Sequence, residues 1–135
     1  MAWVTPKTDW TANNYYNYGD LNRVEGNINA MVDLINTYAS ITGLTSITNR
    51  DITSFEFYDS LNRIEQNVLA LKNATFEPLG WITPKTDWHT LDPFDYTDAN
   101  RLESNLLALY IMVNKIKAYL KYCGTYYCGQ DPTYL

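Results

Sequence analysis

The stretch Leu21-Asn22-Arg23-Val24-Glu25-Gly26-Asn27 decides the fold, because its Asn-Arg-x-Glu-x-Asn pattern occurs three times in a chain of 135 residues. It returns as Asn62-Arg63-Ile64-Glu65-Gln66-Asn67 and as Asn100-Arg101-Leu102-Glu103-Ser104-Asn105. The three arginines are 40 and 38 residues apart, which leaves room for one helix and one connection in each step. We therefore expect each copy to be one structural unit of a repeat.

Apolar residues in each unit recur at alternating steps of three and four. The three sets are Leu21, Val24, Ile28, Met31, Ile35 and Tyr38; Phe57, Leu61, Ile64, Val68 and Leu71; and Ala99, Leu102, Leu106, Leu109, Val113, Ile116 and Leu120. Such spacing gives each helix one apolar stripe, which partner helices must cover. The sequence predicts an all-α fold, an elongated three-helix bundle with helices over residues 17–40, 53–73 and 95–122. Gly43 and Gly124 are the expected helix-ending residues of the first and third helices.

A second repeated element precedes the first and third helices only. Trp3-Val4-Thr5-Pro6-Lys7-Thr8-Asp9-Trp10 returns as Trp81-Ile82-Thr83-Pro84-Lys85-Thr86-Asp87-Trp88, at a constant offset of 78 residues. The prolines disfavour helix in the preceding residue, and the flanking residues favour extended backbone. We expect short extended Trp-containing arms over residues 1–16 and 79–94, and a C-terminal tail over 123–135, within a single domain.

The recurring polar residues are interpreted as a structural repeat. Arg and Glu two residues apart do not share a helix face, so we expect each Glu to reach a neighbouring helix. The alternative, three carboxylates that bind a metal or act as acid and base, is disfavoured because an Arg accompanies each Glu and the one histidine, His89, lies outside the repeat. No catalytic residue, metal or cofactor is expected. The repeat residues are Asn22, Arg23, Glu25, Asn27, Asn62, Arg63, Glu65, Asn67, Asn100, Arg101, Glu103 and Asn105.

The composition limits the kinds of partner that we expect the chain to bind. A net charge of -5 argues against nucleic acid, no apolar run is long enough to cross a membrane, and the start lacks the pattern of a signal peptide. Twelve Tyr and four Trp suit protein interfaces or sugar-binding faces, and we expect the interface among Trp3, Trp10, Tyr15, Tyr16, Trp81, Trp88, Tyr126 and Tyr127. Cys123 and Cys128 are either joined in a small disulfide loop or remain free thiols.

The Thr-Pro-Lys-Thr-Asp-Trp arm, followed by Asp-x-Asn-Arg-(Val/Ile/Leu)-Glu-x-Asn and a heptad tail, resembles a module of virion proteins in phages and prophages of Gram-positive bacteria. The resemblance covers residues 3–38 and 81–120, and residues 53–72 in part, because the middle copy lacks the Trp arm. It implies a structural protein of a bacteriophage particle, in the tail, baseplate, neck or fibre, made in the host cytoplasm and assembled into the virion. Its partners would be other virion proteins and copies of itself. A carbohydrate- or receptor-binding module that stacks sugars on Trp or Tyr is the alternative.

Overall fold

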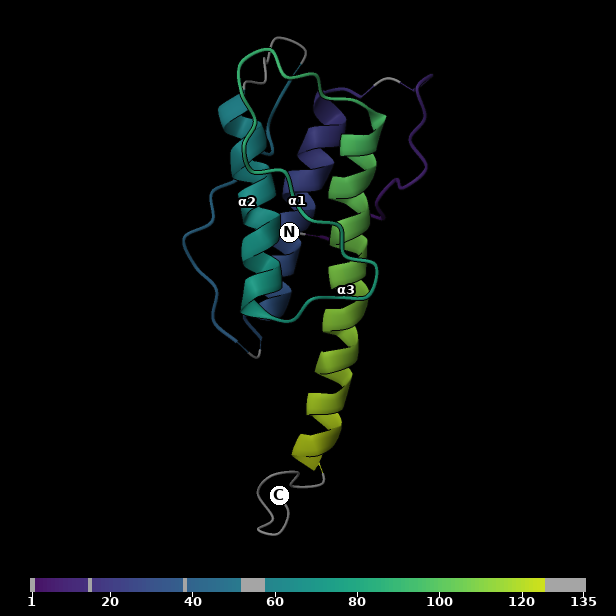
Figure 1. Cartoon of the computed structure of the whole chain (residues 1–135). Helices are drawn as coiled ribbons and strands as arrows, with labels where there is room; N and C mark the ends of the chain where they lie inside the picture. Colours follow the sequence, from purple (N-terminus) through teal and green to yellow (C-terminus); the bar gives the residue numbers. More distant parts are fainter. Residues whose placement is uncertain (1, 15, 38, 52–57, 126–135) are drawn as a thin grey trace.

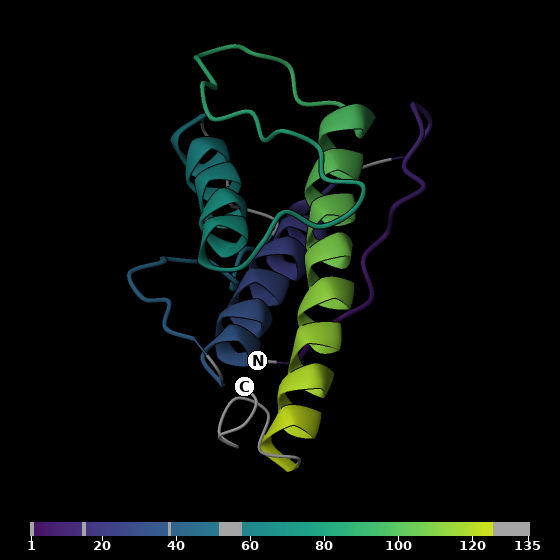
Figure 2. The same ribbon diagram turned by 60° about the horizontal axis from the view of Figure 1, so that its bottom comes forward.

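A computed structural model describes residues 2–14, 16–37, 39–51 and 58–125, the last six as backbone only. Its helices are α1 (Tyr18–Ile35), α2 (Tyr58–Ala74) and α3 (Tyr96–Thr125), and each packs against both others. The three helices run in the same direction, and each connection returns along the outside of the bundle (Figures 1 and 2). No strand occurs in the described part of the chain, so the prediction of an all-α three-helix bundle is confirmed.

The core follows the predicted stripes. Thirteen apolar residues form one cluster, which includes Leu21, Val24, Ile28, Met31 and Ile35 of α1. The predicted stripes also supply Ile64, Val68 and Leu71 from α2, and Leu102, Leu106, Leu109 and Val113 from α3; the remaining member is Ile41, in the connection after α1. Leu61 and Ile116 are only partly buried, and Tyr38 and Phe57 lie outside the described residues.

The N-terminal ends of α1 and α3 are capped by side chains. The Asn17 side chain accepts the amide protons of Gly19 and Asp20, and Asp20 accepts that of Asn17 in return, which completes a capping box. At the start of α3, Asp95 accepts the amide proton of Asp98, and Asp98 accepts that of Asp95 in return.

The C-terminal helix ends differ from the prediction. Helix α1 ends at Ile35 instead of residue 40, because the Asn36 side chain accepts the backbone N–H of Ile41 at 2.9 Å and turns the chain away. Gly43 has a φ of 85°, but it lies beyond this turn and does not end the helix. Helix α3 continues through Gly124 to Thr125. Because Asn27, Asn67 and Asn105 are equivalent, Ile35 and Ala74 correspond to residues 113 and 112, so the last twelve residues of α3 extend beyond the ends of the two other helices.

Candidate functional site

The first arm (residues 3–10) is fixed to two helices by side chains of the repeat. Asn27 of α1 donates to the carbonyl of Val4 at 2.7 Å and accepts its N–H at 2.8 Å. Asn100 of α3 forms the same pair of bonds with the backbone of Trp10, at 3.0 and 2.8 Å. Each Asn side chain therefore makes the two hydrogen bonds that a neighbouring β-strand would make, and satisfies one backbone donor and one acceptor of the arm.

A carboxylate of α3 lies between these two contacts. Glu103 is 0% exposed and accepts the backbone N–H of Lys7 at 3.1 Å and the indole N–H of Trp10 at 2.7 Å. Arg23 of α1 donates its Nε and a terminal nitrogen to the two carboxylate oxygens, both at 2.7 Å. Asp20 accepts from the same guanidinium at 3.0 Å. Four N–H groups therefore surround one buried carboxylate, which ties together α1, α3 and the arm.

The second arm (residues 81–88) repeats this geometry one helix further on. Asn105 of α3 holds the backbone of Ile82, at 2.7 and 2.9 Å. Asn62 of α2 holds the backbone of Trp88, at 3.0 and 2.7 Å. A single carboxylate of α2, that of Glu65, accepts the Lys85 N–H at 3.1 Å, the Trp88 indole N–H at 2.9 Å and the Arg101 Nε at 3.0 Å.

The middle connection (residues 39–51) takes the same place without the Trp motif. Asn67 of α2 donates to the carbonyl of Thr45 at 2.8 Å, and Asn22 of α1 exchanges two bonds with the backbone of Arg50, at 3.0 and 3.1 Å. The Arg50 guanidinium replaces the indole and donates to Glu25 of α1, which also accepts from Arg63 at 2.7 Å. Arg50 is 6% exposed, so a buried cation replaces the buried indole.

These contacts close into a cycle. Each non-helical segment is held by two helices. The helix that follows it in the chain contributes the second Asn of its repeat, which is Asn27, Asn67 or Asn105. The other helix, which is α3 for the first arm, α1 for the middle connection and α2 for the second arm, contributes the first Asn and the Glu of its repeat. The interhelical pairs are Arg23–Glu103, Arg63–Glu25 and Arg101–Glu65. The equivalence defines a class of structure: a parallel three-helix bundle whose single chain is arranged as a pseudo-trimer. The sequence predicts the cross-helix pairs; that the asparagines bind the arms instead of helices is a finding of the structure.

Each carboxylate of the network lies beside a guanidinium. Hydrogen bonds to Glu103 raise the pKa of Arg23 above its ordinary value, against the opposing effect of burial. Burial lowers the pKa of Arg101, but bonds to Glu65 and Asp98 outweigh it and leave the pKa raised. Among the described residues no group of three His, Cys, Asp or Glu is arranged to hold a metal ion. Glu65 and Glu103 instead accept N–H donors at both carboxylate oxygens, as structural ion pairs do, whereas Glu25 Oε1 is buried without a partner in the described structure.

The structure separates the predicted interface aromatics. Trp10 and Trp88 are 6% and 2% exposed, with their indole N–H groups bound to Glu103 and Glu65, which corrects the expectation that these two rings face a partner. Trp3 is half-buried and stacks on Tyr110 with ring centroids 4.0 Å apart, and Trp81 is half-buried with Lys72 Nζ 6.0 Å from its ring. Tyr15, Tyr126, Tyr127 and Cys128 lie outside the described residues, as does the side chain of Cys123.

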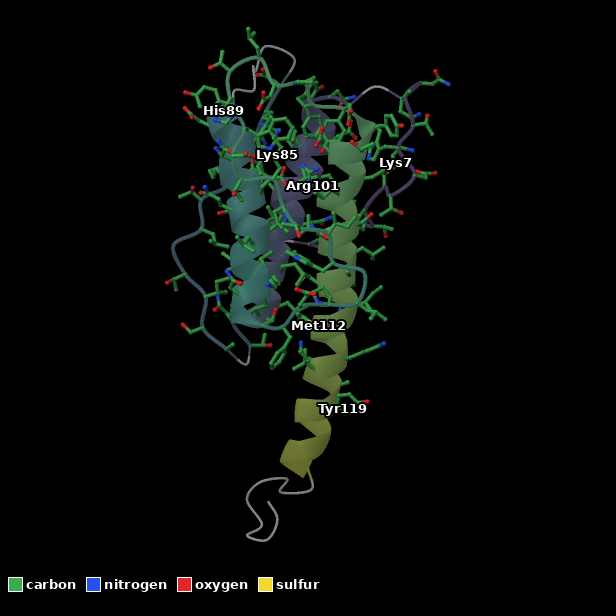
Figure 3. All side chains as sticks on the ribbon, in the orientation of Figure 1. Lys7, Lys85, His89, Arg101, Met112 and Tyr119 are labelled. Carbon is green, nitrogen blue, oxygen red and sulfur yellow. The ribbon has the colours of Figure 1, made fainter. Side chains whose placement is uncertain are left out.

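A cavity lies at the end of the bundle where the three helices begin. Its volume is about 1290 Å³, and Tyr18, Tyr58 and Tyr96, the first residues of the three helices, all line it. They are 44%, 41% and 43% exposed. Tyr16 also lines it and packs between Trp10 and Phe94, with ring centroids 4.9 and 5.1 Å apart. His89, which is a surface residue 76% exposed at its side chain, stands at the same end (Figure 3).

Leu91 on the wall of this cavity has an unusual conformation. It has a φ of 72° and is 96% exposed, although leucine favours neither. The equivalent residue in the first unit is Asn13, whose φ is not positive, although asparagine as a residue type adopts left-handed backbone more readily than leucine. Leu91, Arg50 and the three helix-starting tyrosines were not predicted as site residues from the sequence. For the tyrosines a signal exists, because a tyrosine stands five residues before each repeat arginine.

No protein family, curated protein or solved structure matches the chain. None of the described helices has the length and hydropathy required to span a membrane.

Proposed function

We propose that this chain is a non-catalytic structural protein of a bacteriophage particle, which acts by docking to other particle proteins. The observation that supports this most strongly is that the repeat glutamates, the side chains best suited to catalysis or metal binding, accept hydrogen bonds within the fold. Glu65 and Glu103 are each surrounded by an arginine, an indole N–H and a backbone N–H, and Glu25 by two arginines. Among these three carboxylates, only Glu25 Oε1 is buried without a hydrogen-bond partner in the described structure.

The surfaces that remain suit docking. The exposed large apolar residues include Tyr18, Tyr58, Tyr96 and Leu91 at one end of the bundle, and Ile111 and Tyr119 on the far part of α3. Exposed tyrosines and other large apolar side chains are favoured as interface anchors because they bury much area at little conformational cost. An elongated bundle with extended arms and two distinct ends suits a part that joins neighbours in an assembly.

The assignment to a phage particle depends on the resemblance of the arm and helix motif to virion modules. Its position in the particle, whether tail, baseplate, neck or fibre, is left open. The experiment is mass spectrometry of phage particles purified by density gradient from cells that make this chain. We expect its peptides at a constant ratio to the other particle proteins through the gradient; their absence from the particle fractions would contradict the proposal.

The alternative, a carbohydrate-binding module, has less support from the geometry. Two of the four candidate stacking rings, Trp10 and Trp88, are buried, and Tyr110 covers one face of Trp3. The aromatic cavity is the surface where a glycan would bind. A glycan array probed with the folded chain tests this, and saturable binding that Tyr58→Ser abolishes would favour the alternative.

A further inference from the structure

The far part of α3 extends beyond the ends of the two other helices. Its last twelve residues pass the ends of α1 and α2 and extend about 18 Å at 1.5 Å per residue (Figure 1). Tyr119 on this segment is 72% exposed, and Ile111, three residues before the segment, is 48% exposed. We call residues 114–125 the α3 extension.

The α3 extension is also the basic part of the molecule. Residues 104–130 contain Lys115, Lys117 and Lys121 and no Asp or Glu, a charge of +3, whereas the whole chain carries -5. Lys115 and Lys117 are exposed. Two such extensions placed side by side would bring six lysines together without an acid, so pairing of one extension with another is electrostatically unfavourable.

The cavity at the opposite end has the complementary properties. Asp51, Asp92 and Asp95 line it against one arginine, Arg50, whose guanidinium donates to buried Glu25. Its apolar lining includes the three tyrosines and exposed Leu91. In Figure 3, His89 of this end and Tyr119 of the extension stand at opposite ends of the molecule.

The size of the cavity suits one helix. A helix about 10–12 Å in diameter with a 5.4 Å pitch occupies roughly 500 Å³ per turn, so a cavity of about 1290 Å³ holds about two and a half turns. Three helices begin at the cavity with the positive ends of their dipoles, which oppose the lysines but attract the negative C-terminal end of α3. When copies are stacked in one direction, these ends meet.

We propose that copies of this chain associate head to tail, with the basic α3 extension of one copy seated in the acidic, tyrosine-lined cavity of the next. This contact joins two different surfaces, so it is heterologous and builds open chains or closed rings of copies. It deepens the proposed structural role, on which it rests, by naming a second copy as one docking partner and the two surfaces that meet.

The test uses sedimentation velocity of the full chain and of two variants, each checked for native helicity by circular dichroism. Lys115→Glu/Lys117→Glu reverses the charge of the extension, and Tyr58→Ser/Leu91→Asn removes apolar surface from the cavity. We expect the wild-type chain to form larger species as its concentration rises to about 1 mM, and either variant alone to stay monomeric. Lys115→Arg/Lys117→Arg keeps the charge and should associate like the wild type. High salt should weaken wild-type association about tenfold or more.

Mixing the two variants is the decisive step. A head-to-tail contact leaves one intact extension and one intact cavity in the mixture, so heterodimers should form and should not grow further. Association that the cavity variant leaves unchanged, or a mixture without heterodimers, would overturn the proposal. So would a chain that stays monomeric at about 1 mM, or one that binds vesicles of anionic phospholipid through the extension while monomeric. A monomeric chain still present in purified particles would refute this contact and leave the proposed structural role standing.

Discussion

Replacing Glu103 by Gln tests whether the polar network holds the fold together. Glutamine keeps the size and one acceptor oxygen, but its NH2 group faces donors that Glu103 Oε2 now accepts, from Arg23 and from the Trp10 indole. Removing one partner of a buried ion pair costs about 3–5 kcal/mol. The Arg23 side chain is 19% exposed and keeps Asp20 at 3.0 Å, so we expect the lower end, about 3 kcal/mol. That is a large part of a domain stability of about 5–15 kcal/mol.

The assay is urea denaturation followed by tryptophan fluorescence and by circular dichroism, with the slope compared between variants. Glu77→Gln is the matched control, because the Glu77 side chain is 65% exposed and its ion pair with Lys72 is long, at 3.8 Å. We expect this variant to change the free energy of unfolding by less than about 0.5 kcal/mol. Glu25→Gln should cost more than Glu103→Gln, since it leaves the Arg50 side chain, 2% exposed, without its carboxylate. A cost for Glu103→Gln below about 1 kcal/mol, or equal to that of the control, would refute the reasoning.

Three further predictions concern single positions. Leu91→Asn, which restores the residue of the first unit, should raise the free energy of unfolding by about 0.5–1 kcal/mol by relieving left-handed strain, as urea denaturation would show; a loss of stability contradicts this. The Tyr16 hydroxyl is buried without a hydrogen-bond partner in the described structure, so Tyr16→Phe should leave the thermal midpoint unchanged or higher, and a fall of several degrees would reveal a partner. Hydrogen bonds from Thr97 and the start of α3 lower the pKa of Asp95. Its contribution to the free energy of unfolding is therefore present above the unfolded pKa of about 3.9 and is lost as the pH falls through the lower folded pKa. Asp95→Asn should reduce the stability difference between neutral and acid pH, and an unchanged difference would contradict this.

The helices and core could be predicted from the sequence because their signals are local. The apolar stripe of α1 repeats within seven residues, and its described members are all buried where the spacing places them: Leu21, Val24, Ile28, Met31 and Ile35. The end of α1 could not be predicted in the same way. It depends on a hydrogen bond from Ile41 to the Asn36 side chain, which competes with helix beyond Ile35 and which no periodicity shows.

The role of the arms could be predicted only in part. The constant offset of 78 residues shows that the arm and helix recur together. Trp10, however, contacts Asn100 and Glu103, which are 90 and 93 residues away in the sequence. Such contacts depend on which helix lies beside the arm. Trp looked suited to an outward interface because its area is large, whereas a buried carboxylate satisfies its indole N–H and allows it to sit inside.

The middle connection shows where sequence comparison fails altogether. It occupies the same place as the two arms but is one residue shorter between its helix contacts, and Arg50 takes the position of a tryptophan. A buried arginine and a buried indole share no sequence pattern, although both donate to the repeat glutamate. The recurrence of Asn22 and Asn67 is the sequence feature that corresponds to this third segment, but it did not by itself predict the contact.

Amide hydrogen exchange by NMR tests the central claim, that the repeat pins each arm across two helices, most directly. The backbone N–H groups of Lys7, Trp10, Lys85 and Trp88 donate to side chains of the repeat, whereas those of Thr8 and Asp9 donate to no other residue of the described structure. We predict that the first four exchange about as slowly as the α1 core and that the other two exchange fast. In Glu103→Gln, Lys7 should lose protection while Lys85 keeps it. Fast exchange at all four arm amides in the wild-type chain would contradict the account.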